Sequence, residues 1–368
     1  MPLPALTLGL EEEYQIVHPE TRELTSYVQQ FLDRSRSIVL RDQIKPEFLQ
    51  SQIEVGSSIC RDIREARDEL VRLRRAVREL AESEGMRVAA AGTHPFSTWT
   101  SQLVTAGERY AQHATNMADV ARQMLVFGMH VHVGIEDREL LIDVMNQSRY
   151  FLPHLLALST SSPFWQGRDT GLKSYRSIVI GSLPRSGLPP SFHSWAAYEG
   201  FVATLLRTNC IDEPTKIWWD IRPSVKYPTL EFRLFDICTR IDEAICVTAL
   251  LVGIVGKLIR LRQLNIGWRD YRRNLITENK WRAVRYGTDA RLIDFGKQQE
   301  FPLAELVDEM LEFIDDVADE LGIRREIEYA RTILREGTSA DRQLAVFRRS
   351  GDLNAVVDHL IRETAEDS

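Results

Sequence analysis

The sequence predicts an α+β fold built on an antiparallel sheet. Short strand-like runs alternate with helical segments up to residue 236, and almost every segment from Ile241 onward has helical spacing. Two late strand-like runs, 218–222 and 229–236, are close enough to pair as a hairpin. No internal repeat or low-complexity linker interrupts this order. We therefore expect one domain over residues 1–368, with a helical C-terminal portion from about 241.

The first predicted strand contains the acidic stretch Gly9–Tyr14, flanked by apolar residues. Because side chains alternate between the faces of a strand, Glu11 and Glu13 share one face and Glu12 lies on the other. Two neighbouring carboxylates on an apolar strand repel each other and resist burial. A divalent cation would offset them better than a single lysine. The alternative is an acidic edge strand that is simply solvated.

The later elements follow from local patterns. Asp62 and Glu65 form a capping box that starts a helix, and Gly85 ends it. The other predicted strands are short apolar or alternating runs at 48–56, 86–91, 125–134, 218–222 and 229–236. The other predicted helices lie at 109–123, 138–159, 194–208, 241–263, 268–286, 302–320, 324–335 and from 340 to the C-terminus. Pro153 is expected to start a second helix or to kink the first one.

Residues 161–192 are rich in serine, proline and glycine. This composition predicts a long loop region, and loops of this length often carry function. Arg176 and Arg185 lie within it.

The composition excludes several classes of protein. The net charge of −7 argues against a nucleic-acid-binding surface. The four cysteines are widely spaced, which predicts reduced, buried thiols in a cytoplasmic protein. The longest apolar run, around 245–259, is expected to be too short and too interrupted to span a membrane. There is no GxxxxGK[ST], GxSxG or HExxH motif.

Several predicted strands carry polar side chains at i, i+2 spacing, which places them on one face. These side chains are Glu11 and Glu13, Glu54, His130 and His132, and Glu231 and Arg233. Together they could hold two or three Mg²⁺ or Mn²⁺ ions, with ATP phosphates completing the coordination. Taken singly, each has an ordinary alternative as a core histidine, a salt-bridge partner or a rim residue. Their coincidence on four predicted strands favours a joint site.

Six motifs in sequence order resemble those of the YbdK-type carboxylate–amine ligases, also called glutamate–cysteine ligase type 2, in the glutamine synthetase superfamily. The motifs are GLEEEY, QIEVG, GMHVHVG, LPRSG, WWDIRPS and TLEFRLFDICTR. The resemblance runs from Gly9 to about Gly287. It implies a curved antiparallel sheet that forms an open half-funnel, with helices on its outer face, and a single catalytic domain.

The resemblance also implies an activity. ATP would phosphorylate a carboxylate, typically the γ-carboxylate of glutamate, and an amine such as cysteine would displace the phosphate to form an amide. Two alternatives stay open: a superfamily phosphotransferase resembling the guanidino kinases, without an amide product, and a nucleotide-binding protein without turnover. The exposed sheet edges and helices of such a fold leave a homodimer open.

Position by position, the resemblance implies roles for individual residues. The implied metal ligands are Glu11, Glu13, Glu54, His130 and Glu231. His132 would face the nucleotide, and Arg233 would contact the transferring phosphate, with Arg222 as a weaker candidate for the same pocket. Arg185 and Arg176 match a region that binds the substrate carboxylate.

Overall fold

The sheet at the centre of the molecule has seven strands in the order β10–β11–β5–β1–β3–β2, and β4 pairs with the far end of β1. The computed structural model describes residues 2–27 and 43–366. The strands are β1 Leu8–Val17, β2 Ile44–Pro46, β3 Gln52–Gly56, β4 Arg87–Ala89, β5 Gly128–Gly134, β10 Ile221–Pro223 and β11 Thr229–Asp236. Every pair in this sheet is antiparallel. The sheet is open rather than closed into a barrel, so the predicted fold class is confirmed.

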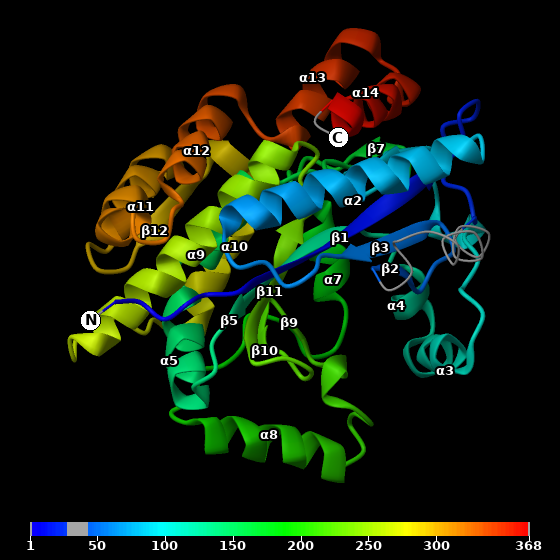
Figure 1. Ribbon diagram of the computed structural model, residues 1–368. Helices are drawn as coiled ribbons and strands as arrows, with labels where there is room; N and C mark the ends of the chain where they lie inside the picture. The colour runs from blue at the N-terminus through cyan, green and yellow to red at the C-terminus, as the bar shows by residue number, and fades with distance from the viewer. Residues whose placement is uncertain (1, 28–42, 367–368) are drawn as a thin grey trace.

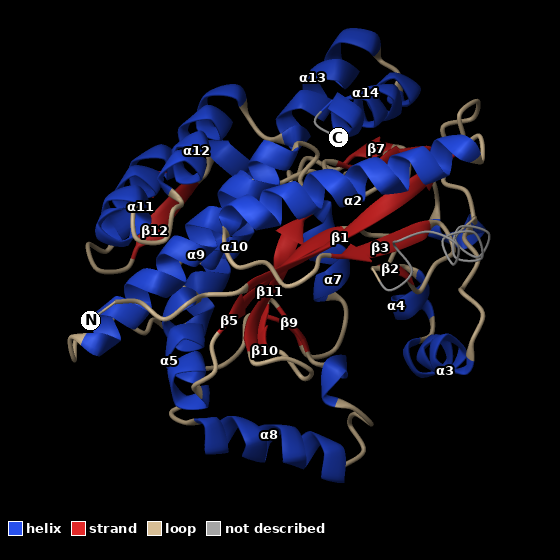
Figure 2. Cartoon of the chain, in the orientation of Figure 1, coloured by secondary structure: helices blue, strands red, loops and turns tan. Residues whose placement is uncertain are grey.

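Helices cover one face of the sheet, and Figures 1 and 2 show α2 and α9 lying across it. The main helices are α2 Ile63–Ser83, α3 Glu108–Met117, α4 Asp119–Arg122, α5 Arg138–Ser148, α6 Leu152–Leu158, α7 Tyr175–Gly181, α8 Trp195–Arg207, α9 Ile241–Gln263, α10 Arg273–Tyr286, α11 Leu303–Ala318, α12 Arg324–Glu336, α13 Ser339–Ser350 and α14 Leu353–Glu366. Alternate residues of β1, such as Leu8 and Leu10, are buried against these helices. The opposite face of the sheet is left for polar side chains.

Local signals predicted most helix ends. The Asp62 side chain accepts a hydrogen bond from Glu65 N, and Gly85 has a φ of 73°, which suits a residue just beyond a helix end. Pro153 lies in the first turn of a separate helix, α6, where proline is tolerated. Gly351, with a φ of 66°, divides the last predicted helix into α13 and α14. The end of that prediction, 367–368, lies outside the described residues.

Short strand pairs also lie outside the main sheet. The pairs are β6 Phe164–Trp165 with β7 Arg168–Asp169, β8 Ser186–Gly187 with β9 Trp218–Trp219, and β12 Arg291–Asp294 with β13 Gln299–Pro302. β9 falls within the predicted run 218–222, and the β12–β13 hairpin interrupts the helical C-terminal portion. The other strands of these pairs were not predicted, because runs of two to four residues are too short to establish a period of two.

Helix α9 corrects one expectation about apolar segments. It spans 23 residues, and its most apolar window has a mean hydropathy of 2.1, so it is long and apolar enough to cross a membrane. However, 83% of that window is buried inside the protein. This burial is typical of the core helix of a soluble protein.

A second correction concerns the cysteines, which were expected to be buried. Cys210 is exposed just beyond α8, while the other three are buried.

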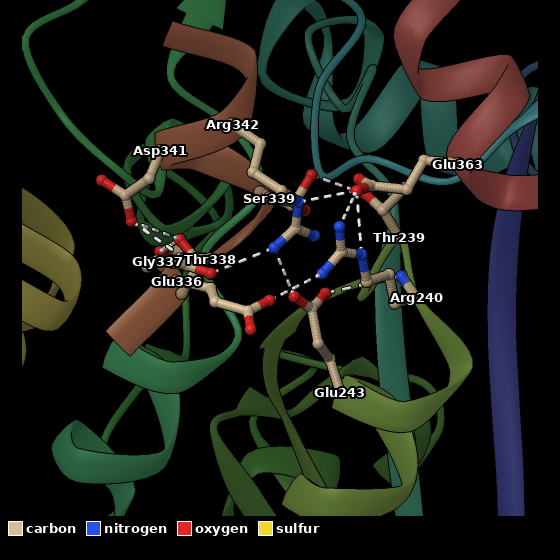
Figure 3. A network of polar contacts seen from close by, with 12 residues as sticks. Thr239, Arg240, Glu243, Glu336, Gly337, Thr338, Ser339, Asp341, Arg342 and Glu363 are labelled. Carbon is tan, nitrogen blue, oxygen red and sulfur yellow. Dashed lines mark hydrogen bonds and ion pairs between the residues drawn. The ribbon is translucent and has the colours of Figure 1, made fainter. Parts of the chain in front are cut away.

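A buried ionic network holds the C-terminal helices against α9 (Figure 3). Arg342 of α13 donates to Glu243 of α9 at 2.6 Å and lies 2.7 Å from Glu363 of α14. Arg240, at the start of α9, donates to Glu363 at 2.9 Å. Both carboxylates are buried, so each charge needs its partner. The network explains how α13 and α14 are fixed against the start of α9.

Candidate active site

The alternation of side chains along β1 places Glu11 and Glu13 on the face of the sheet that the helices leave open, whereas Glu12 points towards α2. Antiparallel pairing aligns Glu11 with His130 of β5 and Glu13 with Glu54 of β3. Directly paired residues share a face of the sheet. The strands therefore bring these predicted site residues together.

A first cluster contains Glu11, His132 and Glu231, which come from three neighbouring strands. One ligand atom of each lies within 4.8 Å of the others. The hydroxyl of Thr229 lies 3.0 Å from His132 Nδ1 and orients the ring, whose Nε2 faces Glu11 at 3.9 Å. Two carboxylates and a ring nitrogen thus converge on one point.

His130 lies beside this cluster and contacts two of the charged groups. Its Nδ1 is 3.3 Å from Glu11 Oε2 and 3.5 Å from Arg233 Nη1. Burial and then the charge of Arg233 lower the pKa of His130 to about 4, so the ring is neutral at neutral pH. Burial raises the pKa of Glu11, but contacts with His130 and His132 outweigh it and hold this pKa well below its usual range.

A second cluster contains the carboxylates of Glu13, Glu47 and Glu54, again within 4.8 Å of one another. Burial raises the pKa of Glu13 to about 7; Arg176 opposes this rise and Glu54 adds to it. Burial and repulsion from Glu54 and Glu13 raise the pKa of Glu47 well above its usual range. Crowded carboxylates with raised pKa values are poorly compensated by the protein alone. Such a group favours a bound cation.

Lys45 and Glu47 belong to the site but carry no i, i+2 signal on a recognisable strand. Lys45 pairs with Glu54 across β2 and β3, and its Nζ lies 2.9 Å from Glu54 and 3.3 Å from Glu11. It therefore bridges the two clusters. Glu47 follows Pro46 in the turn between β2 and β3. The three-residue strand β2 is too short to be recognised from the sequence, so neither residue could be placed.

Two arginines hold the carboxylate of Glu231. Arg222 donates to it from Nε at 2.8 Å and from Nη2 at 3.2 Å, and Arg222 Nη1 donates to the carbonyls of Thr215 and Ile217 at 2.8 and 2.6 Å. Arg233 Nη1 also donates to Oε1, the oxygen that Arg222 Nη2 contacts. Burial raises the pKa of Glu231, but Arg233 and Arg222 keep it well below its usual range. Glu231 is therefore ionised and fixed in place.

Arg233 lies two residues after Glu231 on β11, so both side chains point to the same face of the sheet. Arg233 N donates to the carbonyl of Asp220, next to β10, at 2.8 Å. On the other side of β11, the pairing with β5 shifts register between Phe232 and Phe235. Lys280 of α10 binds the Asp220 carboxylate at 2.7 Å and stabilises this edge.

The structure places Arg176 and Arg185 differently. Arg176 of α7 is buried, and its guanidinium donates to the carbonyls of Leu234 and Arg233, each at 3.2 Å. The guanidinium lies against Gly128, whose N–H donates to Glu13 Oε2 at 2.6 Å, so Arg176 lies beside the second cluster. Arg185 donates to the Lys216 carbonyl at 3.2 Å and lies over the Trp218 ring.

Asp236, at the end of β11, attaches the long loop to the sheet. Its Oδ2 accepts hydrogen bonds from Ser161 N at 2.9 Å and from the Ser162 hydroxyl at 2.7 Å, and its Oδ1 accepts one from Ser174 at 2.8 Å. The loop is therefore anchored where it leads into α7 and Arg176.

The model of the Glutamate-cysteine ligase family 2 matches residues 7–359. The chain belongs to this family. Two proteins named "Putative glutamate--cysteine ligase 2" are similar to it along nearly the whole chain. The one from Roseiflexus castenholzii is 55% identical over 98% of this chain and 95% of its own length. The one from Chloroflexus aurantiacus is 54% identical over 98% of this chain and 93% of its own length.

Solved structures of other ligases share the fold of this family member. Glutamate–cysteine ligase from Francisella tularensis, crystallised in complex with AMP, matches with a TM-score of 0.74 at 12% identity, over 100% of this chain and 90% of that one. A bifunctional glutathione synthetase from Pasteurella multocida matches with a TM-score of 0.71 at 14% identity, over 98% and 52%. The predicted family membership and fold are both confirmed.

Proposed function

We propose that this protein is an ATP- and Mg²⁺-dependent carboxylate–amine ligase that joins the γ-carboxylate of glutamate to cysteine or a related amine. The observation that carries the proposal is the pair of acidic clusters on the open face of the sheet, bridged by Lys45 and bordered by Arg233. Family membership supports the reaction type, and the two clusters could hold the cations that such a reaction needs.

The donor set fits divalent cations. Carboxylate oxygens with one imidazole nitrogen suit Mg²⁺ or Mn²⁺ rather than softer metals. We assign the first site to Glu11, His132 and Glu231 and the second to Glu13, Glu47 and Glu54. The predicted ligand His130 then serves as a contact that orients Glu11. Bound ions of this kind would bridge the ATP phosphates to the substrate carboxylate and neutralise their repulsion.

Among the arginines, we assign phosphate contact to Arg233. It lies at the edge of the first cluster, next to Glu231, and carries a permanent charge. Arg222 directs its hydrogen bonds at Glu231 and at two backbone carbonyls, so we assign it to holding Glu231 in position. Arg176, with its charge beside Glu13, is a stronger candidate for the substrate carboxylate than Arg185, which lies over the Trp218 ring.

The reaction would proceed in two displacements. A carboxylate oxygen of glutamate attacks the γ-phosphorus of ATP, the bond to the ADP oxygen breaks, and an acyl phosphate forms. The amine nitrogen then attacks the acyl carbon and phosphate leaves with the bonding electron pair; the amine proton goes to the solvent. A neutral amine needs little general-base help, which accords with a site dominated by carboxylates and arginines.

We place this reaction in the cytoplasm. All four cysteines are free, as expected in a reducing compartment that also supplies ATP. The partners that the proposal requires are small molecules: ATP, glutamate or a similar carboxylate, and an amine or amino acid.

The proposal is tested by incubating the purified protein with ATP, Mg²⁺, glutamate and a panel of amines that includes cysteine. We expect ADP, phosphate and the γ-glutamyl amide in equal amounts, and the formation of each product should require both glutamate and the amine. Glu231→Gln should abolish all three products, whereas Glu328→Gln, an exposed site on α12, should not. A stable phosphorylated product without amide would indicate a phosphotransferase instead, and nucleotide binding without turnover would indicate a binding protein.

A further inference from the structure

Lys45 lies on the open face of the sheet, in one row with two glutamates of the candidate site. It pairs directly with Glu54 of β3, which pairs with Glu13 of β1, and directly paired residues share a face. Its Nζ lies 2.9 Å from Glu54 Oε1 and 3.3 Å from Glu11 Oε1. Gly56, which is opposite Glu11, has no side chain to keep the ammonium away from Glu11. The Lys45 ammonium therefore contacts one carboxylate of each cluster.

The structure holds Lys45 less firmly than the arginines of the site. Its side chain is 49% exposed, compared with 21% for Arg233 and 9% for Arg222. Arg222 also donates to two backbone carbonyls, whereas within residues 2–27 and 43–366 the Lys45 ammonium donates only to the two carboxylates. A lysine carries a compact charge on a flexible stem. Lys45 can therefore change partners without a movement of the backbone.

The carboxylates that Lys45 contacts are among those assigned to the two cation sites. Divalent cations at these sites would neutralise Glu11 and Glu54 and would repel the ammonium, since like charges at short range are unfavourable. Lys45 and the divalent cations therefore compete for the same carboxylates. A displaced ammonium needs another anion, and the phosphates of ATP are anions that a lysine binds well.

Lys45 and Arg233 approach the site from opposite sides. Arg233 lies on β11 and Lys45 on β2, and β5, β1 and β3 lie between these strands in the sheet. A row of contacts crosses the face between them. Lys45 contacts Glu11, Glu11 lies 3.3 Å from His130 Nδ1, and this nitrogen lies 3.5 Å from Arg233 Nη1. The two positively charged side chains thus border the space above the sheet.

We propose that Lys45 exchanges partners during the reaction. It holds Glu11 and Glu54 in the free protein, and when divalent cations bind it contacts the phosphates of ATP from the side opposite Arg233. The proposal rests on the proposed function, because it takes the cations and ATP as ligands of this site. Lys45 then has two roles, as a competitor of the cations and as a direct contact of the nucleotide.

The two roles predict changes of opposite sign in one variant. In Lys45→Met, Mn²⁺ should bind roughly fivefold more tightly in the absence of nucleotide, because no internal positive charge competes for the carboxylates. A non-hydrolysable ATP analogue should bind at least ~10-fold more weakly at saturating Mg²⁺, because a charged contact with phosphate is lost. Electron paramagnetic resonance measures the affinity for Mn²⁺, and isothermal titration measures the affinity for the analogue. Lys45→Arg keeps a positive charge, so both of its changes should be smaller.

Lys297 provides the matched control. Its side chain is 48% exposed, and its ammonium contacts Glu309 and lies 3.5 Å from Asp294. It lies in the turn between β12 and β13, and Figure 1 shows β12 at the opposite end of the molecule from β2 and β3. Lys297→Met should leave both affinities at their wild-type values.

The proposal stands only if Lys45→Met shows both changes relative to Lys297→Met. If either affinity is unchanged, or if both ligands bind more weakly because Lys45 is a structural support, this proposal alone is overturned. A wild type that binds neither Mn²⁺ nor the analogue would refute the proposed function, and the role of Lys45 with it. If Lys45→Met does not fold, Lys45→Gln, which is also uncharged, replaces it in both titrations.

Discussion

The carboxylate of Glu12 and the guanidinium of Arg74 form a bidentate ion pair directly behind the two glutamates of the site. Arg74 Nε and Nη2 donate to the two carboxylate oxygens at 2.9 and 2.6 Å, and both side chains are essentially inaccessible to solvent. Arg74 also donates to the carbonyls of Thr239 and Cys238. The pair therefore ties β1 to α2 and to the segment that starts α9. It fixes the strand from which Glu11 and Glu13 project.

Replacing Arg74 with methionine should lower the free energy of unfolding by about 3–5 kcal/mol, because it leaves the Glu12 charge buried without a partner. Urea denaturation followed by circular dichroism measures the change. The double variant Glu12→Leu/Arg74→Met should be less destabilised than the single variant Arg74→Met, since Glu12→Leu removes the carboxylate that has lost its partner.

Arg72 provides the matched control for this prediction. It lies on the same helix and pairs with Glu69 at the surface. Arg72→Met should change the stability by less than about 1 kcal/mol. Equal effects of the two substitutions would show that the buried pair has no special role.

Glu47 should separate stability from activity. Glu47→Gln relieves repulsion in the second cluster, so we expect the metal-free protein to gain about 1 kcal/mol in free energy of unfolding, as is common when a functional site is relaxed. The same change should lower glutamate-dependent ADP formation at least ~100-fold by removing a ligand. Thermal unfolding and the ADP assay on one preparation test both parts. If the Glu47→Gln variant keeps its activity, or is less stable than the wild type, the assignment of Glu47 to the site is wrong.

The two arginines around Glu231 should respond differently to conservative replacement. Arg233→Lys should lower kcat about 10²–10³-fold with little effect on stability, because a lysine cannot reproduce the planar contact with phosphate. Arg222→Lys should instead lower the free energy of unfolding by about 2–4 kcal/mol, since it loses contacts with Glu231 and two backbone carbonyls. Steady-state kinetics and denaturation of both variants distinguish these roles. A loss of kcat in Arg222→Lys together with a loss of stability in Arg233→Lys would show that the two assigned roles must be exchanged.

His94 should make the protein sensitive to acid. The ring is buried, with Nε2 at 2.8 Å from the Arg22 carbonyl and Nδ1 accepting from Ser97 N at 3.0 Å, and burial lowers its pKa to about 3. Between about pH 6.5 and 3 the unfolded chain binds a proton that the folded protein excludes. The contribution of His94 to the free energy of unfolding is therefore fully present above pH 6.5. It is lost as the pH falls below 6.5, by up to about 1.4 kcal/mol per pH unit.

The His94→Gln variant isolates that contribution. Its loss of stability between pH 6.5 and 4 should be shallower than that of the wild type, although it is less stable at neutral pH. His193→Gln, at an exposed position, should keep the wild-type slope. Chemical denaturation at a series of pH values provides the slopes, and identical slopes for His94→Gln and the wild type would contradict the assignment.

The sequence predicted those parts of the site in which the spacing of residues along a single strand shows which side chains share a face. The i, i+2 spacing of Glu11 with Glu13 and of His130 with His132 identified shared faces before any pairing was known. Pairing of β1 with β5 then places Glu11 opposite His130. The hairpin of β10 and β11 likewise places Arg222 opposite Glu231.

What the sequence could not reveal depends on contacts between distant segments. Lys45 reaches Glu11 across two strands, and Glu47 reaches Glu13 because a turn folds it over the sheet. Glu12 looked like the third member of an acidic run, yet its role depends on Arg74, 62 positions away. The register shift between β11 and β5, next to Arg233, also has no marker in the sequence.

The central claim is that two clusters on one face of the sheet each hold a divalent cation. Titration with Mn²⁺, followed by electron paramagnetic resonance in the presence of ATP, tests it most directly, with Glu231→Gln, Glu47→Gln and the exposed control Glu328→Gln alongside the wild type. We predict at least two bound ions in the wild type and the control, and the loss of a different one in each site variant. Unchanged Mn²⁺ binding in both site variants would contradict the claim.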